Sequence, residues 1–198
     1  MSSNTITYDC VDTKSQPITG SHSAISRVLP QEYSINGSYS VISDGDITTK
    51  TEKDARREII NQYKQEILNI VINDTFENGL LSQSEVYINN RHSNNGIIFI
   101  KDALMELYID NLNDSKILIG LLIMIGSLSF QEAKPQGQTM ALGLLQNKDL
   151  SVRDRAIQVF EKWNSKEGIP ILKSLSCDRV WLQRYVDKVI SYLERDGI

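Results

Sequence analysis

Hydrophobic side chains recur at α-helical spacing along most of the chain, beginning near residue 51. The first run contains Ile59, Ile60, Tyr63, Ile67, Ile70 and Val71. It follows the sequence TEKD, which resembles a capping box at the start of a helix, with Asp54 in place of the usual glutamate. We therefore expect a long helix that begins at Thr51 and ends before Gly79, since glycine favours helix termination.

The rest of the chain after this run predicts more helices joined by short connections. Composition marks 91–96 as a loop, and Pro170 fits the first turn of a helix, where its missing N–H costs no hydrogen bond. The expected helices begin at about residue 82 and then span 97–111, 116–128, 138–146, 150–164, 168–176 and 179–195. The pattern predicts an all-α fold.

Residues 1–50 show no helical period and are rich in serine, threonine and asparagine. Alternating apolar and polar residues at 32–42 flank Asn36 and Gly37, a pair that favours a tight hairpin turn. A lone hairpin is marginally stable in water. We expect an irregular N-terminal arm at 1–50, with a small β-hairpin, before a helical domain at 51–198; a contact strand or a flap docked on the helices are the alternatives.

A shift of about thirty residues aligns the last helices with those before them. The aligned pairs are Val152 with Leu182, Ala156 with Val186, Val159 with Val189, Phe160 with Ile190, Trp163 with Leu193, Ala141 with Ile171, Leu142 with Leu172, and Leu145 with Leu175. A further set, Leu118, Leu122 and Ile125, aligns with Val152, Ala156 and Val159 at a spacing nearer thirty-four. Periods of this size are typical of stacked helix pairs; the alternative is a bundle without repeats.

The segment LLQNKDLSVRDRAIQVF carries a resemblance to the HEAT-like repeat family, in its short form with a period near thirty. The matching positions are Leu145, Asp149, Val152, Arg153 and Ala156, and EGIPILKSL resembles the second helix of such a repeat. The last unit departs from the pattern at Leu182, Gln183 and Val186, and the upstream unit has Gly120 near the arginine position. Over residues 115–195 the resemblance implies a short right-handed α-solenoid.

The same residues have a physical interpretation of their own. Asp149 is expected to cap the helix at 150–164, with Ser151 as the alternative cap. The small side chain of Ala156 lets a neighbouring helix approach. Arg153 is expected to pair with an acidic residue in an adjacent turn, with contact to a ligand as the alternative.

Charge and composition exclude several classes of protein. Among 198 residues there are 21 basic and 25 acidic side chains, a net charge of −4 that divides as −2 on each side of residue 50. Such a balance does not favour nucleic-acid binding, which generally needs a basic stripe. The apolar run at 117–130 is shorter than the roughly 20 residues of a membrane helix. The two cysteines, Cys10 and Cys177, and the absence of a signal-like N-terminus predict a reduced cytoplasmic setting.

Catalytic and metal-binding motifs are absent from the sequence. It contains no phosphate-binding glycine loop, no H-E-x-x-H and no C-x-x-C. His22 and His92 fall in expected loops; a Cys177–His92 nucleophile pair is formally possible, and no Cys or His pair has the spacing of zinc ligands. We therefore expect no enzymatic activity, cofactor or metal.

The last helix holds the candidate binding residues. Trp181, Tyr185 and Tyr192 fall beside its apolar face, next to Arg184 and Lys188, and aromatic side chains with arginine are typical of protein-contact hot spots. Alternatively, these rings cap the array or are covered by residues 1–50.

From these patterns the sequence predicts a non-catalytic protein-binding module. A bacterial immunity protein that inhibits a toxin is the more specific hypothesis, since the Asn-, Ile- and Ser-rich usage hints at a bacterial or phage source. The alternatives are a nucleic-acid-binding or base-repair protein, because DNA glycosylases built on HEAT-like repeats exist, and a homodimer formed through Trp181 and Tyr185.

Overall fold

The computed structural model describes residues 45–77, 80–91 and 96–197, which all belong to one compact unit at 41–198. Within these ranges every regular element is helical and no strand occurs, so the predicted all-α class is confirmed for the described part. The helices are α1 (Gly45–Asn73), α2 (Gln83–Arg91), α3 (Ile97–Asp110), α4 (Ser115–Gly126), α5 (Phe130–Ala133), α6 (Gln136–Leu144), α7 (Leu150–Trp163), the 3-10 turn η1 (Lys166–Gly168), α8 (Ile169–Lys173) and α9 (Val180–Asp196). The predicted hairpin at 32–42 lies outside the described residues.

The largest differences from the sequence prediction are the start of α1 and the presence of α5; smaller shifts occur at the ends of α6 and α8. Helix α1 begins at Gly45, so the expected capping box at Thr51 is wrong: no proline interrupts the preceding residues, and the helix continues through them. The expected loop after α4 contains the short helix α5. Ser129 and Glu132 form a reciprocal capping box there, in which each side chain accepts a hydrogen bond from the other residue's backbone N–H.

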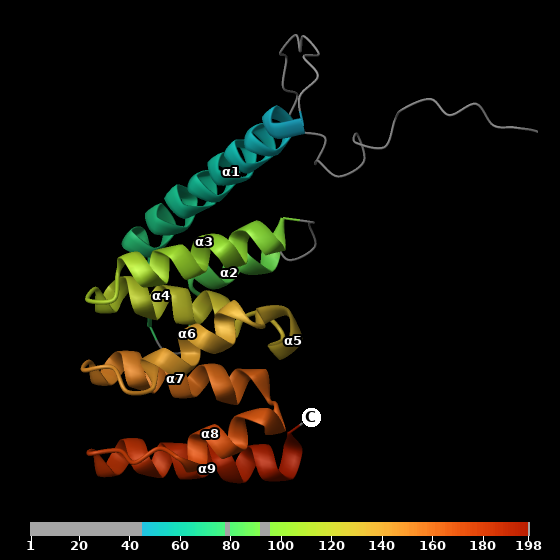
Figure 1. Cartoon of the computed structure of the whole chain (residues 1–198). Helices are drawn as coiled ribbons and strands as arrows, with labels where there is room; N and C mark the ends of the chain where they lie inside the picture. Colours follow the sequence, from blue (N-terminus) through green and yellow to red (C-terminus); the bar gives the residue numbers. More distant parts are fainter. Residues whose placement is uncertain (1–44, 78–79, 92–95, 198) are drawn as a thin grey trace, which may run out of the picture. The chain divides into compact units, whose positions relative to one another are not determined.

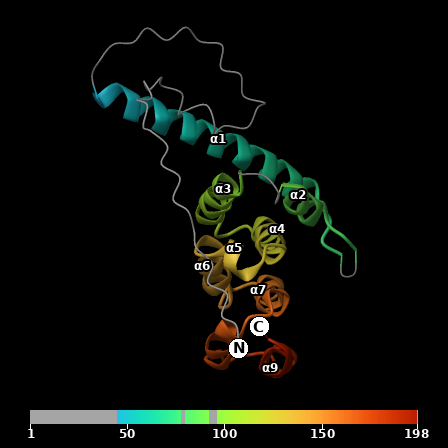
Figure 2. The same cartoon turned by 90° about the vertical axis from the view of Figure 1, so that its right-hand side faces the viewer.

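The helices pack in two columns. One column holds α3, α6 and α8, the other holds α2, α4, α7 and α9, and α1 lies across α2 and α3 at one end of both columns (Figures 1 and 2). From α2 to α9 successive helices therefore alternate between the columns, apart from the short α5, and the core lies between the columns. Helix α4 is buried along nearly its whole length, because it is covered by α1, α2, α3, α6 and α7. This accounts for the unbroken apolar sequence at residues 117–126.

The burial of side chains agrees with the thirty-residue alignment of α7 with α9. It disagrees with part of the alignment of α6 with α8. Val152, Ala156 and Val159 are fully buried, as are their partners one period later. The alignment of Leu142 with Leu172 is wrong, since Leu142 is 39% exposed and Leu172 is 0% exposed. A 3-10 turn leads into α8 and winds more tightly than an α-helix, which changes the register of the apolar positions.

Polar contacts at the helix starts join neighbouring layers. Asp149 caps α7 as expected: its Oδ1 accepts the backbone N–H of Ser151 at 2.8 Å, so the alternative cap by Ser151 is wrong. Hydrogen bonds from Ser115 at the start of α4, and then from the backbone of Ser151, hold the pKa of Asp149 below its ordinary value. Arg153 forms an ion pair of 2.8 Å with Asp178, in the turn before α9. The ends of α4, α7 and α9 are linked in this way.

Replacement of Gly120 by alanine is expected to lower the free energy of unfolding by about 1–2 kcal/mol. Alanine is favoured over glycine within a helix by about 1 kcal/mol, so propensity alone would give a gain. A Cβ at Gly120, however, would lie 2.6 Å from Cγ1 of the buried Val71 of α1, so α1 and α4 would have to separate. Urea denaturation followed by circular dichroism measures the change.

Gly126→Ala on the same helix is the matched control for this prediction. Its Cβ would meet Val159 at 3.3 Å, a contact that a small shift relieves, and we expect a change close to zero. Equal or greater stability of the Gly120→Ala variant would contradict the close packing of α1 on α4.

Candidate functional site

The five residues that the sequence predicted for protein binding lie along α9, and we call Trp181, Arg184, Tyr185, Lys188 and Tyr192 the α9 surface. The helix buries the adjoining side, with Leu182, Val186, Val189 and Leu193 all at 0% exposure. The amphipathic pattern therefore determines how far each of the five side chains is exposed. Three of them are exposed and two are half-buried.

Two of the aromatic residues are half-buried. Tyr185 and Tyr192 pack against the core, and the Tyr185 hydroxyl donates a hydrogen bond to the Glu161 carboxylate on α7. Burial, and then the bond to Glu161, raise the pKa of Tyr185 far above its ordinary value, so this hydroxyl stays protonated. Tyr185 thus contributes to the packing of α9 on α7 and presents only part of its ring to solvent.

The other three residues are exposed. Trp181 is 50% exposed, and Arg184 and Lys188 form no ion pair or hydrogen bond with any residue in the described ranges. The neighbouring Val180, which sequence reasoning did not single out, is 68% exposed. The exposure of Val180 could have been predicted, because the helical period places it opposite the buried positions of α9. The structure therefore places apolar and cationic side chains together at the start of the last described helix.

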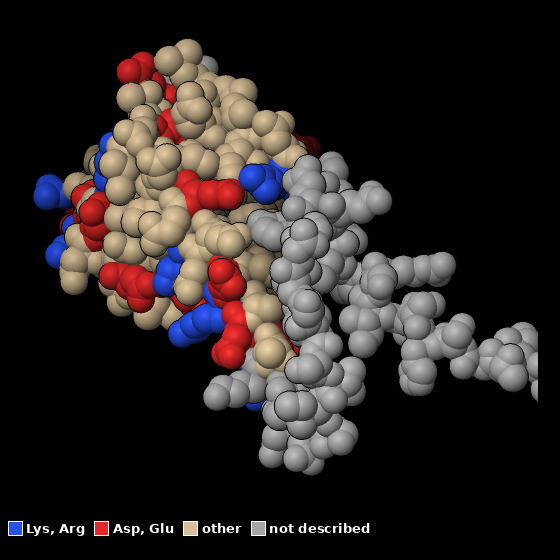
Figure 3. Space-filling model, turned by 90° about the horizontal axis from the view of Figure 1, so that it is seen from above, with Lys and Arg blue, Asp and Glu red and all other residues tan. Residues whose placement is uncertain are grey.

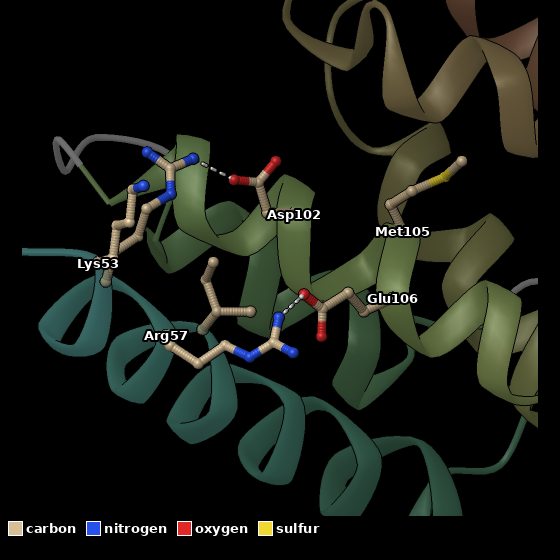
Figure 4. Close-up of a pocket in the computed structure, with 7 residues that line it drawn as sticks. Lys53, Arg57, Asp102, Met105 and Glu106 are labelled. Carbon is tan, nitrogen blue, oxygen red and sulfur yellow. Dashed lines mark hydrogen bonds and ion pairs between the residues drawn. The ribbon is translucent and has the colours of Figure 1, made fainter. Parts of the chain in front are cut away.

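A second site, not found from the sequence, is a shallow groove between α1 and α3, which we call the α1–α3 groove (Figure 4). It is lined by Lys53, Arg56, Arg57, Ile60, Asp102, Met105 and Glu106. The basic residues come from α1 and the acidic ones from α3, so only the folded pairing of the two helices brings them together. Its sequence signal was weak: acidic residues at 102, 106 and 110 fall on one side of α3, as a solvated face also would.

Ion pairs join the two walls of the groove. Arg56 Nη2 lies 2.6 Å from Asp102 Oδ2, and Arg57 Nη1 lies 3.3 Å from Glu106 Oε1. Lys64, one turn beyond the groove, forms a third ion pair between the two helices, with Glu106 at 3.0 Å. The two arginine side chains remain 52% and 69% exposed, so these pairs are screened by solvent and contribute little stability individually.

The described residues offer little for nucleophilic or metal chemistry. Cys177 is half-buried, and burial raises the pKa of its thiol, which disfavours the reactive thiolate. Its proposed partner His92 lies outside the described ranges, as do His22 and Cys10. Within the described ranges no group of three or more His, Cys, Asp or Glu side chains is placed to hold a metal ion.

The surface seen from the α1 end carries both signs of charge. Acidic and basic side chains are interspersed there, without a continuous basic face among the drawn residues (Figure 3). Among the described residues, no helix has both the length and the apolar character that crossing a bilayer requires. No family model, curated protein or solved structure matches the chain, and the geometry above is the basis on which a function can be assigned.

Proposed function

We propose that this chain is a non-catalytic protein-binding module built from HEAT-like helix pairs. The pairs are α1 with α2, α3 with α4, α6 with α7, and α8 with α9, so the proposed array includes the helices upstream of residue 112. The two columns of packed helices and the burial shared by α7 and α9 support this arrangement. Arrays of this kind present extended surfaces to other macromolecules.

The observation that carries the proposal is the exposed end of α9. Trp181 and Val180 are large apolar side chains at 50% and 68% exposure, and Arg184 lies one turn further along the same helix. Tryptophan and arginine are enriched among the residues that dominate protein–protein affinity. Packing among the described residues leaves the ring of Trp181 and the two cations, Arg184 and Lys188, uncovered. A protein partner that covers them would explain why they are there.

As the more specific form of this function we propose an inhibitor of a toxin, an immunity protein of bacterial origin. The support for this form is the sequence composition and the acidic balance of the chain. Interspersed charge on the face of Figure 3 does not favour a nucleic-acid-binding role.

Truncation of Trp181 is expected to weaken binding of the partner by roughly 30-fold or more, which corresponds to a hot-spot loss of about 2 kcal/mol. The partner is first purified with the tagged wild-type chain from its native host, and the affinities of Trp181→Ala and Lys188→Glu are then measured by biolayer interferometry. Lys166→Glu, an exposed lysine of η1 that forms no ion pair among the described residues, serves as the charge-reversal control.

The outcomes of this experiment separate the classes of function. A partner that binds all variants equally would contradict the α9 surface as the contact. If wild-type chain purifies with nothing and sediments as a dimer that Trp181→Ala dissociates, the chain is a self-assembling subunit instead. Turnover of a co-purified small molecule would contradict a non-catalytic role.

A further inference from the structure

We propose that the α1–α3 groove is a second interaction surface, and that it binds an acidic protein segment carrying an apolar side chain. This surface is separate from the α9 surface, and the proposal does not depend on it. Four features of the groove support the choice: its inventory of hydrogen-bond donors and acceptors, its charge, its apolar lining and the exposure of its basic wall.

The donors of the groove are only partly used. Arg56 and Arg57 each place one nitrogen on a carboxylate, although a guanidinium has five N–H donors. Lys53 donates to no residue in the described ranges. In Figure 4 Lys53 and Arg57 project from α1 on the groove side, and Arg57 reaches toward Glu106. The α1 wall therefore offers several N–H groups to a ligand.

The acceptors of the groove are occupied by comparison. Asp102 accepts Arg56 on Oδ2 and the side-chain amide of Gln136 on Oδ1, at 2.6 and 3.1 Å. Glu106 accepts Arg57 on Oε1 and Lys64 on Oε2, at 3.3 and 3.0 Å. All four carboxylate oxygens thus hold a bond already, so the groove has free donors and no unoccupied carboxylate oxygen. A ligand rich in acceptors fits this inventory.

Charge leads to the same ligand. Three cationic side chains and two carboxylates line the groove, which leaves one positive charge in excess. The acidic residues of the same stretch of α1, Glu52, Asp54 and Glu58, do not line it. Because Lys53 has no counterion among the described residues, an incoming carboxylate gains an ion pair without having to break one.

The apolar lining decides between a protein and a polyanion. Half-buried Met105 supplies most of it, with Ile60, 6% exposed, at its base, and methionine adapts its shape readily to an apolar side chain. A nucleic-acid backbone would need a longer basic track than three residues within about two helical turns, and it would approach a chain of net charge −4. Glutamate or aspartate residues spaced around a leucine or phenylalanine match the mixture of cations and apolar surface.

Fluorescence anisotropy with the full chain tests this proposal. The probe is a fluorescein-labelled synthetic peptide with leucine at every third position and glutamate elsewhere. Lys53→Glu combined with Arg57→Gln is expected to weaken binding roughly tenfold, since removing charged contacts at an interface changes affinity by about this amount. Lys148→Glu, an exposed lysine in the connection between α6 and α7, is the matched control and should bind within about twofold of wild type. Both groove substitutions lie on exposed helix positions, so the variants should remain folded. Circular dichroism of each variant checks this.

Two further probes define what would overturn the proposal. A peptide with glutamine in place of each leucine has the same charge, and binding as tight as that of the leucine peptide would exclude the apolar contact. A labelled oligothymidylate that binds more tightly than the peptide would assign the groove to nucleic acid. Equal affinity of the groove variant and the Lys148→Glu control would also refute the site. Trp181→Ala should leave peptide binding unchanged, which keeps this result separate from the test of the α9 surface.

Discussion

Replacement of Trp163 by alanine is expected to lower the free energy of unfolding by about 3–5 kcal/mol, the range for large aromatic residues truncated in a core. Trp163 ends α7 and is 6% exposed. Its ring lies 5.4 Å from that of Phe130 on α5 and 5.5 Å from that of Phe160 on α7, both measured between ring centroids. Its Nε1 donates to the Ile125 carbonyl of α4 at 3.1 Å. The substitution removes contacts to three helices at once.

Trp163→Phe separates the ring from its hydrogen bond. Phenylalanine keeps much of the aromatic contact and loses the donor to Ile125, so a smaller loss of about 1–2 kcal/mol is expected. Denaturation followed by circular dichroism measures both variants. In either variant Trp181 is the only remaining tryptophan, so fluorescence then reports on α9 alone. Losses of equal size for the two variants would mean that the hydrogen bond, and not the packing, carries the effect.

Replacement of Asp74 by alanine is expected to cost about 2–4 kcal/mol, because bonds to a charged acceptor are worth more than neutral ones. Asp74 follows α1, is 4% exposed, and closes the connection to α2. Its Oδ1 accepts the backbone N–H groups of Thr75 and Gln83 at 2.8 and 3.0 Å, and its Oδ2 accepts that of Ser84 at 2.7 Å. Alanine leaves all three donors without this partner. Urea denaturation gives the loss, and a variant as stable as wild type would show that water replaces the carboxylate.

The same residue predicts a pH dependence. Burial by itself would raise the pKa of Asp74, but the hydrogen bonds from Ser84, Gln83 and Thr75 outweigh it and hold the pKa below the ordinary 3.8. Because the folded pKa is lower than the unfolded one, the contribution is present above the ordinary value and is lost as pH falls through the folded pKa. Between about pH 6 and about pH 3, wild type should therefore lose more stability than Asp74→Asn, whose amide does not titrate in this range.

Local signals predicted the helices well, and tertiary contacts account for what they missed. Periodic apolar residues located α3, α4, α7 and α9 to within a few residues, because each helix buries one side or is wholly buried. The cap at Asp149 was readable because a helix start needs an acceptor close in sequence. Helix α5 was overlooked although Ser129 and Glu132 form a recognisable capping box, since its apolar residues are too few to show a period.

The candidate sites differ in the same way. The amphipathic pattern of α9 gave the direction of Trp181, but no pattern indicated that Tyr185 would be held by Glu161 of α7. The α1–α3 groove depends on pairs such as Arg56 with Asp102, which are 46 positions apart in the sequence. Such a pairing depends on how two helices pack, and local patterns in a single sequence do not predict it.

The near-complete burial of α4 has a consequence for biosynthesis. This segment leaves the ribosome before α7, the helix that covers one of its sides, has been translated. Until α7 is translated, one side of the strongly apolar α4 lacks the helix that covers it in the folded chain. A fragment that ends between α4 and α7 would expose the same side. The nascent chain therefore passes through a stage in which aggregation, or capture by a chaperone, competes with native packing.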